Sequence, residues 1–97
     1  MTILKREMGY TRPEFMRTLP AALHDYEYHI EGDVITIIPP EAADKTMTIT
    51  LGSEAVRKIA LIRIPYIHVD FDFSQVEEAV HRRFLTQFDL YFKKGGG

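Results

Sequence analysis

The side chains best suited to chemistry are His68, Asp70 and Asp72, which occupy every second position of one short segment. The positions between and beside them are all apolar: Ile67, Val69, Phe71 and Phe73. Alternation of this kind, with β-branched and aromatic residues, predicts a half-buried strand. The imidazole and both carboxylates would then share the solvent-facing side, and this donor set suits zinc, manganese or iron.

A metal site on this strand needs help from a second strand. Outward residues two apart are about 7 Å from each other, so a shared ion requires a ligand from a neighbour. His29 is the candidate, with Glu27 on the same predicted face, if its strand lies beside that of His68. The alternative is a solvated sheet face. His68 could also act as a general base near neutral pH, but the sequence shows no nucleophile beside it.

The glycines Gly95, Gly96 and Gly97 follow two lysines. The first glycine can end a helix in a left-handed conformation, and the others are then a plain tail. Alternatively, a Gly96–Gly97 carboxylate resembles the terminus of ubiquitin-like sulfur carriers, which an adenylating enzyme modifies. Those carriers are β-grasp folds with a strand before the tail, whereas the pattern here predicts a helix.

Composition indicates one globular domain over residues 1–97. The chain has 97 residues, 45% of them hydrophobic, and a net charge of −2. It has no cysteine, which excludes disulfides, thiol nucleophiles and thiolate metal sites and suits a reducing cytoplasm. Scattered lysines and arginines disfavour general nucleic-acid binding. We expect no signal peptide, no membrane span and no cofactor.

The N-terminal half predicts a short helix and a hairpin. Thr11 and Glu14 have capping-box spacing, and Pro20 should break or kink the helix. Gly32 and Asp33 form a hairpin signal with Gly first. Pairing across this turn places apolar residues opposite each other, namely Ile30 with Ile35 and Tyr28 with Ile37. Val34 and Ile38 would be exposed on the solvent-facing side of the sheet.

The next segment predicts two further strands. Residues 46–51 alternate, with Met47, Ile49 and Leu51 facing inward. The chain should then turn at residues 52–54, with one helical turn at residues 55–58. The apolar positions change phase across Pro65, so we expect a bend or bulge at residues 64–66.

The last segment predicts a helix that closes the core. A second capping box, from Ser74 to Glu77, would open it. His81 falls on its apolar side, where a partly buried core histidine is expected. The apolar stripe comprises Val76, Val80, Phe84, Phe88, Tyr91 and Phe92, with Leu85 at its edge.

These elements predict an α+β two-layer sandwich. An antiparallel sheet of four to five strands would carry a short N-terminal helix and a long C-terminal helix on one face. The ordered core would span about residues 10–92, with residues 1–9 and 93–97 flexible. If residues 2–6 form a further strand, the element order is similar to one repeat of the TATA-binding-protein fold. That likeness concerns the fold alone.

The region from Tyr10 resembles a group of short uncharacterised bacterial proteins. The matching segments are residues 10–15 (YTRPEF), 57–65 (RKIALIRIP) and 88–97 (FDLYFKKGGG). The resemblance implies no activity and no site residue.

Three functions therefore stay open. The first is a non-catalytic interaction or accessory domain in the cytoplasm that self-associates or binds a protein partner. The second is a metal-binding protein or enzyme that uses His68, Asp70, Asp72 and His29. The third is a carrier that acts through Gly96 and Gly97.

Overall fold

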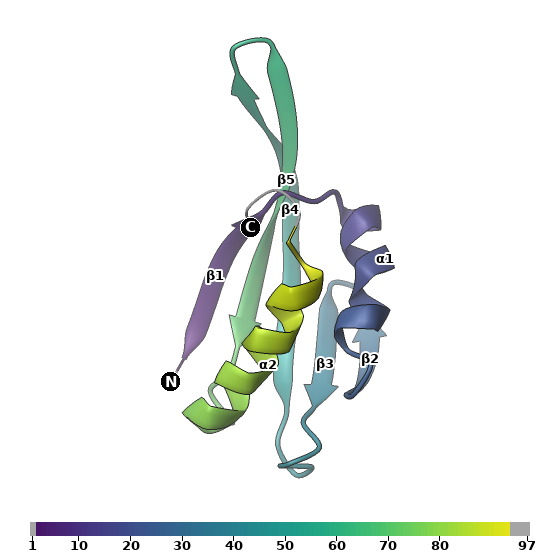
Figure 1. The fold of residues 1–97 in the computed structure, drawn as a ribbon, viewed down its shortest axis with the longest axis vertical. Helices are drawn as coiled ribbons and strands as arrows, with labels where there is room; N and C mark the ends of the chain where they lie inside the picture. Colours follow the sequence, from purple (N-terminus) through teal and green to yellow (C-terminus); the bar gives the residue numbers. More distant parts are fainter. Residues whose placement is uncertain (1, 94–97) are drawn as a thin grey trace.

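The computed structural model describes residues 2–93 as one sheet covered by two helices. The strands form a five-stranded antiparallel sheet in the order β1-β5-β4-β3-β2, which confirms the predicted α+β class. Figure 1 shows α2 in front of the sheet and the β4–β5 hairpin projecting beyond it. In chain order the elements are β1 (Ile3–Met8), α1 (Arg12–Ala22), β2 (Glu27–Glu31), β3 (Val34–Ile38), β4 (Met47–Ile59), β5 (Ile62–Asp72) and α2 (Glu78–Tyr91).

The core lies between the inward face of the sheet and both helices. Phe15 and Leu19 of α1 and Phe84 and Phe88 of α2 are buried in one cluster with the inward strand residues. Both helices therefore cover the same sheet face, which leaves the other face uncovered within residues 2–93.

Strand β1 is an addition to the expected ordered core. Its residues pair with β5 from Ile3 opposite Asp72 to Met8 opposite Ile67, and Met8 is fully buried. The expected boundary at residue 10 is therefore wrong for residues 3–8. The segment LKRE has no apolar alternation that would show a strand, and its pairing partner is distant in sequence. The element order is the one compared above with a TATA-binding-protein repeat.

Helix α1 begins as predicted but does not break. Thr11 is its N-cap, and both hydrogen bonds of the capping box with Glu14 are present. Pro20 lies inside the last turn, and the helix continues to Ala22. Pro20 faces solvent while Leu19 beside it is buried, so burial of the other side holds the helix across the proline.

The β2–β3 hairpin has the predicted register. Ile30 pairs with Ile35 and Tyr28 with Ile37 across a turn where Gly32 has φ of 59°. A positive φ is the reason for glycine at this position.

Strand β4 continues where a turn was expected. Met47, Ile49 and Leu51 face inward as predicted, but the chain neither turns at residues 52–54 nor forms a helical turn at residues 55–58. Both expectations are wrong, because glycine and serine here belong to a bulge. Leu51 pairs with Val69 and Glu54 with Ile67, so two residues of β4 oppose one residue of β5.

The change of apolar phase in β5 is a change of face, since Ile62 and Ile64 are exposed on the side opposite to the buried Ile67. The bend or bulge expected at residues 64–66 is therefore wrong, because β5 runs without a register shift past Pro65 and the bulge lies in β4 instead. A Cβ atom at Gly52 would stand 3.1 Å from the Cβ of His68, so the bulge brings the two backbones close together.

Helix α2 begins later than predicted. Its N-cap is Glu77, which makes no capping hydrogen bond with its side chain, and Ser74 belongs to a turn after β5. The capping box at Ser74 is therefore wrong. The apolar stripe is largely confirmed, since Phe84, Phe88 and Phe92 are buried, although Tyr91 is exposed.

Candidate functional site

The most exposed apolar surface among the described residues lies on the far part of the β4–β5 hairpin. We call residues 55–66 the arm. Strand β3 pairs with β4 only as far as Thr50, and β1 pairs with β5 only from Ile67 onward, so no other described strand flanks the arm. Five large aliphatic side chains of the arm are exposed: Val56, Ile59, Leu61, Ile62 and Ile64.

The pairing register divides the arm into two faces. Directly opposed residues of an antiparallel pair project to the same side. Val56 pairs with Pro65 and Lys58 with Arg63 on the side that continues the core face. The outer face, which continues the uncovered face of the sheet, is formed by the pairs Ala55–Tyr66, Arg57–Ile64 and Ile59–Ile62.

The tip of the arm is a two-residue turn of unusual composition. Ala60 and Leu61 connect the paired residues Ile59 and Ile62, and Ala60 has φ of 55°. Such turns favour glycine or asparagine, because a left-handed conformation costs other residues about 1–2 kcal/mol. Leu61 has a relative exposure of 101%, so no other residue of the described range 2–93 covers its side chain. A strained backbone that presents a free leucine suggests a contact site.

The charge on the arm is entirely positive. It carries Arg57, Lys58 and Arg63 and no aspartate or glutamate. The Arg57 guanidinium lies 4.7 Å from the centre of the Tyr66 ring and donates to a Glu7 carboxylate oxygen at 2.7 Å. These contacts fix the base of the outer face against β1.

The predicted metal ligands do not converge. His68 and Asp70 lie on β5, but His29 lies on β2, and strands β4 and β3 separate β2 from β5. The condition for His29 to complete the site is therefore not met. In the part of the chain that the structure describes, no three His, Cys, Asp or Glu side chains are arranged to hold a metal ion.

Basic side chains lie beside the carboxylates nearest to His68. Lys5 is directly opposite Asp70 in the β1–β5 ladder, and Glu7 already pairs with Arg57. The Nδ1 atom of His68 is 3.9 Å from a Glu7 oxygen. An open hollow is lined by Lys5, Arg6, Glu7, His68 and Asp70. Within the described residues, its imidazole and two carboxylates do not form a group that could hold a metal ion. The metal hypothesis thus has no geometric support from residues 2–93.

Asp72 has a structural role at the end of β5. One of its carboxylate oxygens accepts hydrogen bonds from the Ser74 hydroxyl at 2.6 Å and the Ser74 amide at 2.9 Å. The hydroxyl bond, and then the amide bond, lowers the pKa of Asp72 because both stabilise the ionised form.

His81 is half-buried, as expected for a core histidine. Its ring stacks on Phe73 with a centroid distance of 4.8 Å and an angle of 18°. Gly96 and Gly97, on which the carrier hypothesis rests, lie outside the described residues.

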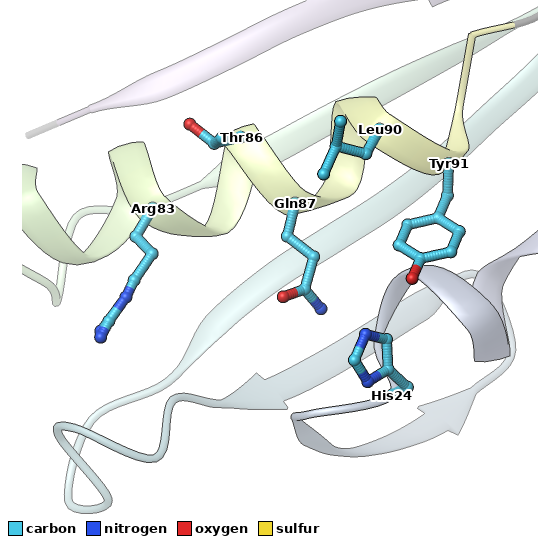
Figure 2. A pocket seen from close by; sticks show the side chains of 6 residues that line it. All are labelled: His24, Arg83, Thr86, Gln87, Leu90 and Tyr91. Atoms are coloured by element: carbon cyan, nitrogen blue, oxygen red, sulfur yellow. The ribbon is translucent and has the colours of Figure 1, made fainter.

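A second hollow, of about 390 Å³, lies between α2 and the end of α1. Figure 2 shows His24 below Tyr91, with Gln87 pointing toward the same region. The Gln87 amide donates to the Ala22 carbonyl at 3.0 Å, which ties the two helices together. Its wall consists of His24, Arg83, Thr86, Gln87, Leu90 and Tyr91.

This second hollow has few of the groups that catalysis needs. The Nδ1 atom of His24 is 3.0 Å from an Asp25 oxygen, but both side chains are about half-exposed. The Thr86 hydroxyl donates to the Arg82 carbonyl and is thereby used within α2. The hollow was not anticipated from the sequence, because its residues come from two segments that meet only in the fold.

The comparisons add no relative. We find no match to this chain among protein-family models, curated proteins or solved structures. The resemblance to uncharacterised bacterial proteins stays a prediction. No helix within residues 2–93 has the length and apolar character needed to cross a membrane.

Sequence reasoning missed the arm, although a signal was present. Residues 58–63 read KIALIR, which is nearly symmetric about the centre: a cation and an isoleucine on each side of Ala60 and Leu61. Symmetry of this kind fits two strands folded on each other. The absence of glycine or asparagine at the turn concealed it.

Proposed function

We propose that the protein is a non-catalytic interaction domain that contacts a protein partner through the outer face of the arm. The observation that carries this proposal is the set of uncovered aliphatic side chains on a hairpin that extends past the core. Large contiguous apolar surfaces on a folded domain mark interaction sites. Free strand edges along the arm add unpaired backbone groups that a partner can also use.

The arrangement of the arm favours binding over catalysis. Its side chains are aliphatic or basic, and the outer face has one aromatic residue, Tyr66. Interface centres are typically formed by apolar residues together with arginine and tyrosine, whereas acid–base chemistry needs convergent titratable groups. The cysteine-free sequence fits the reducing environment of the cytoplasm, where we propose that the domain acts.

Purification from the native cells under mild conditions tests this proposal. Tagged wild-type protein should retain a defined protein, identified by mass spectrometry, which is either another chain or a further copy of this one. The double variant Ile59→Thr/Ile62→Thr should lose that protein while keeping its circular dichroism spectrum. Val56→Thr, on the other face of the arm with the same exposure of 53% as Ile59, is the matched control.

Two results would count against this role. One is a wild-type protein that retains no other protein and does not self-associate. The other is a retained protein that binds the double variant as well as it binds the wild type.

A further inference from the structure

We infer that the partner of the arm is a second copy of this chain, which receives the arm on the outer face of its β2–β3 hairpin. The inference rests on the proposed function and names the occupant of that same surface. It is carried by two faces of one molecule that are complementary in charge and similar in apolar character.

The charge of the chain is divided between the arm and the remainder. The arm carries three of the twelve lysines and arginines and none of the fourteen acidic residues, so its charge is +3. The rest of the chain contains the other nine cations and all fourteen acidic residues, so its net charge is −5. Of the three cations of the arm, Arg57 lies on the outer face, whereas Lys58 and Arg63 lie on the other face. Two arms packed by their outer faces would bring two Arg57 side chains together, whereas an arm packed on an acidic face of a second copy brings opposite charges together.

The β2–β3 hairpin offers the matching surface. Val34 is directly opposite Glu31, and Ile38 is directly opposite Glu27. These pairs lie on the sheet face that the helices leave uncovered, since the alternate residues Ile35 and Ile37 are buried in the core. Val34, Glu27 and Glu31 are all exposed.

The two glutamates are available for an intermolecular contact. Within residues 2–93, neither Glu27 nor Glu31 has an ion-pair partner. Arg57 on the outer face of the arm uses one nitrogen for Glu7, and a guanidinium has five N–H donors, so it can also reach a carboxylate of a second molecule. Ile59 and Ile62 would lie against Val34 and Ile38.

The positions of the two surfaces suit a closed dimer. The arm's outer face and the outer face of β2–β3 belong to the same side of one sheet, at different places along the molecule. Two copies placed with these sides together, about 10 Å apart, are related by a two-fold axis that lies between the surfaces. Each arm then contacts the β2–β3 face of the other copy, so both contacts form together.

Sedimentation equilibrium of the purified full chain over a wide concentration range, at low and at high salt, tests the inference. We expect a monomer–dimer equilibrium that weakens as salt screens the charges. Ile59→Thr should raise the dimer dissociation constant at least about tenfold, because the aliphatic surface of Ile59, half-exposed in the monomer, would no longer be buried at the dimer interface. Val56→Thr, on the other face, should leave the constant within about twofold of the wild-type value.

Charge reversal makes the test specific for the two surfaces. Arg57→Glu alone, and Glu27→Lys/Glu31→Lys alone, should each give monomers. Mixed in equal amounts, the two variants should form a heterodimer. The arm that carries Arg57→Glu then meets the introduced lysines of the other variant, and the unchanged Arg57 arm of that second variant meets the glutamates of the first. Lys58→Glu changes the net charge of the chain as Arg57→Glu does but lies on the other face of the arm, and it should keep the dimer.

The inference and the proposed function fail under different results. A wild-type chain that stays monomeric over the whole concentration range would overturn the inference. The same holds if that monomer binds anionic vesicles or DNA instead. A dimer unaffected by Ile59→Thr, or variants that do not recover when mixed, would overturn it as well. If the arm variants still lose a different protein from native cells, the proposed function stands without the dimer.

Discussion

Asp72 illustrates at the scale of the single residue how a potential metal ligand can serve the fold. Its carboxylate accepts two hydrogen bonds from Ser74 at the point where β5 ends and the chain turns toward α2. The predicted capping box used the same serine for α2, but the carboxylate two residues earlier binds it instead. Local hydrogen bonds of this kind compete with helix capping.

Removal of the Ser74 hydroxyl should raise the pKa of Asp72. In the native protein the pKa is lower than the ordinary value of about 3.9, so the unfolded chain binds more protons as the pH falls. The carboxylate therefore contributes stability above its unfolded pKa and loses that contribution as the pH falls through the native value. Carbon-detected NMR titration of wild type and Ser74→Ala measures the change.

An unchanged Asp72 titration in Ser74→Ala would show that the serine hydroxyl does not stabilise the carboxylate. Asp70→Asn is a suitable comparison, since it removes a neighbouring acid of the same strand face without touching the turn.

Phe84 carries one of the main contacts between α2 and the sheet. It is 1% exposed and makes edge contacts with Tyr26 at 5.4 Å and Phe73 at 5.9 Å between ring centres. Phe84→Ala should lower the free energy of unfolding by about 3–5 kcal/mol, because it leaves a cavity. Arg82→Ala, on the exposed side of the same helix, should change it by less than about 0.5 kcal/mol. Urea denaturation followed by circular dichroism compares the two, and equal losses would contradict the assigned core.

The arm is the element on which the functional account depends. It is a long two-stranded hairpin with no described strand beside it, and a positive φ at Ala60 strains its turn. Two-stranded hairpins are marginally stable alone in water, so the arm should open more often than the rest of the sheet.

Replacement of Ala60 by glycine should stabilise the arm. Glycine adopts φ of 55° without a steric cost, and the gain should be up to about 1 kcal/mol, partly offset by its greater freedom in the unfolded chain. Amide hydrogen exchange should then slow at residues 55–66 and stay the same in β3. Faster exchange in Ala60→Gly would show that the turn is not strained.

Element prediction worked where burial imposes a pattern. The β2–β3 register and the inward residues of β4 follow from alternation, because each apolar residue there faces a core. The arm has solvent on both faces, so its sequence has no alternation of apolar and polar residues. The glycine in the bulge, Gly52, is a residue type that is also typical of a turn. Strand β1 was only a conditional expectation, at residues 2–6, for the related reason that charged residues fill three of its central positions.

The candidate site could be predicted only in part. The sequence correctly places His68, Asp70 and Asp72 on one strand, but strand order decides whether His29 joins them, and one sequence does not contain that order. Val34 and Ile38 were both expected to be exposed, and Val34 is exposed whereas Ile38 is half-buried. Ile59 and Leu61 were expected within a strand that begins after residue 58, and their exposure was not predicted.

At the scale of the whole molecule, the arm makes the protein elongated. The principal extents are 48, 25 and 24 Å, and the radius of gyration is 13.8 Å, compared with about 12.5 Å for a compact chain of this length. Figure 1 shows the hairpin extending beyond the rest of the sheet. The hairpin carries uncovered aliphatic residues, and the exposed Glu27 and Glu31 lie on β2, a combination suited to contact with another molecule.

The assignment of the outer face of the arm as the contact surface is tested most directly by site-specific photo-crosslinking in the native cells. A photoreactive residue at position 62 projects from the outer face, and one at position 56 projects from the other face. The account predicts a crosslink to one defined protein from position 62, and a product at least about tenfold weaker from position 56. Equal crosslinking from both positions, or no crosslink from position 62, would contradict the account.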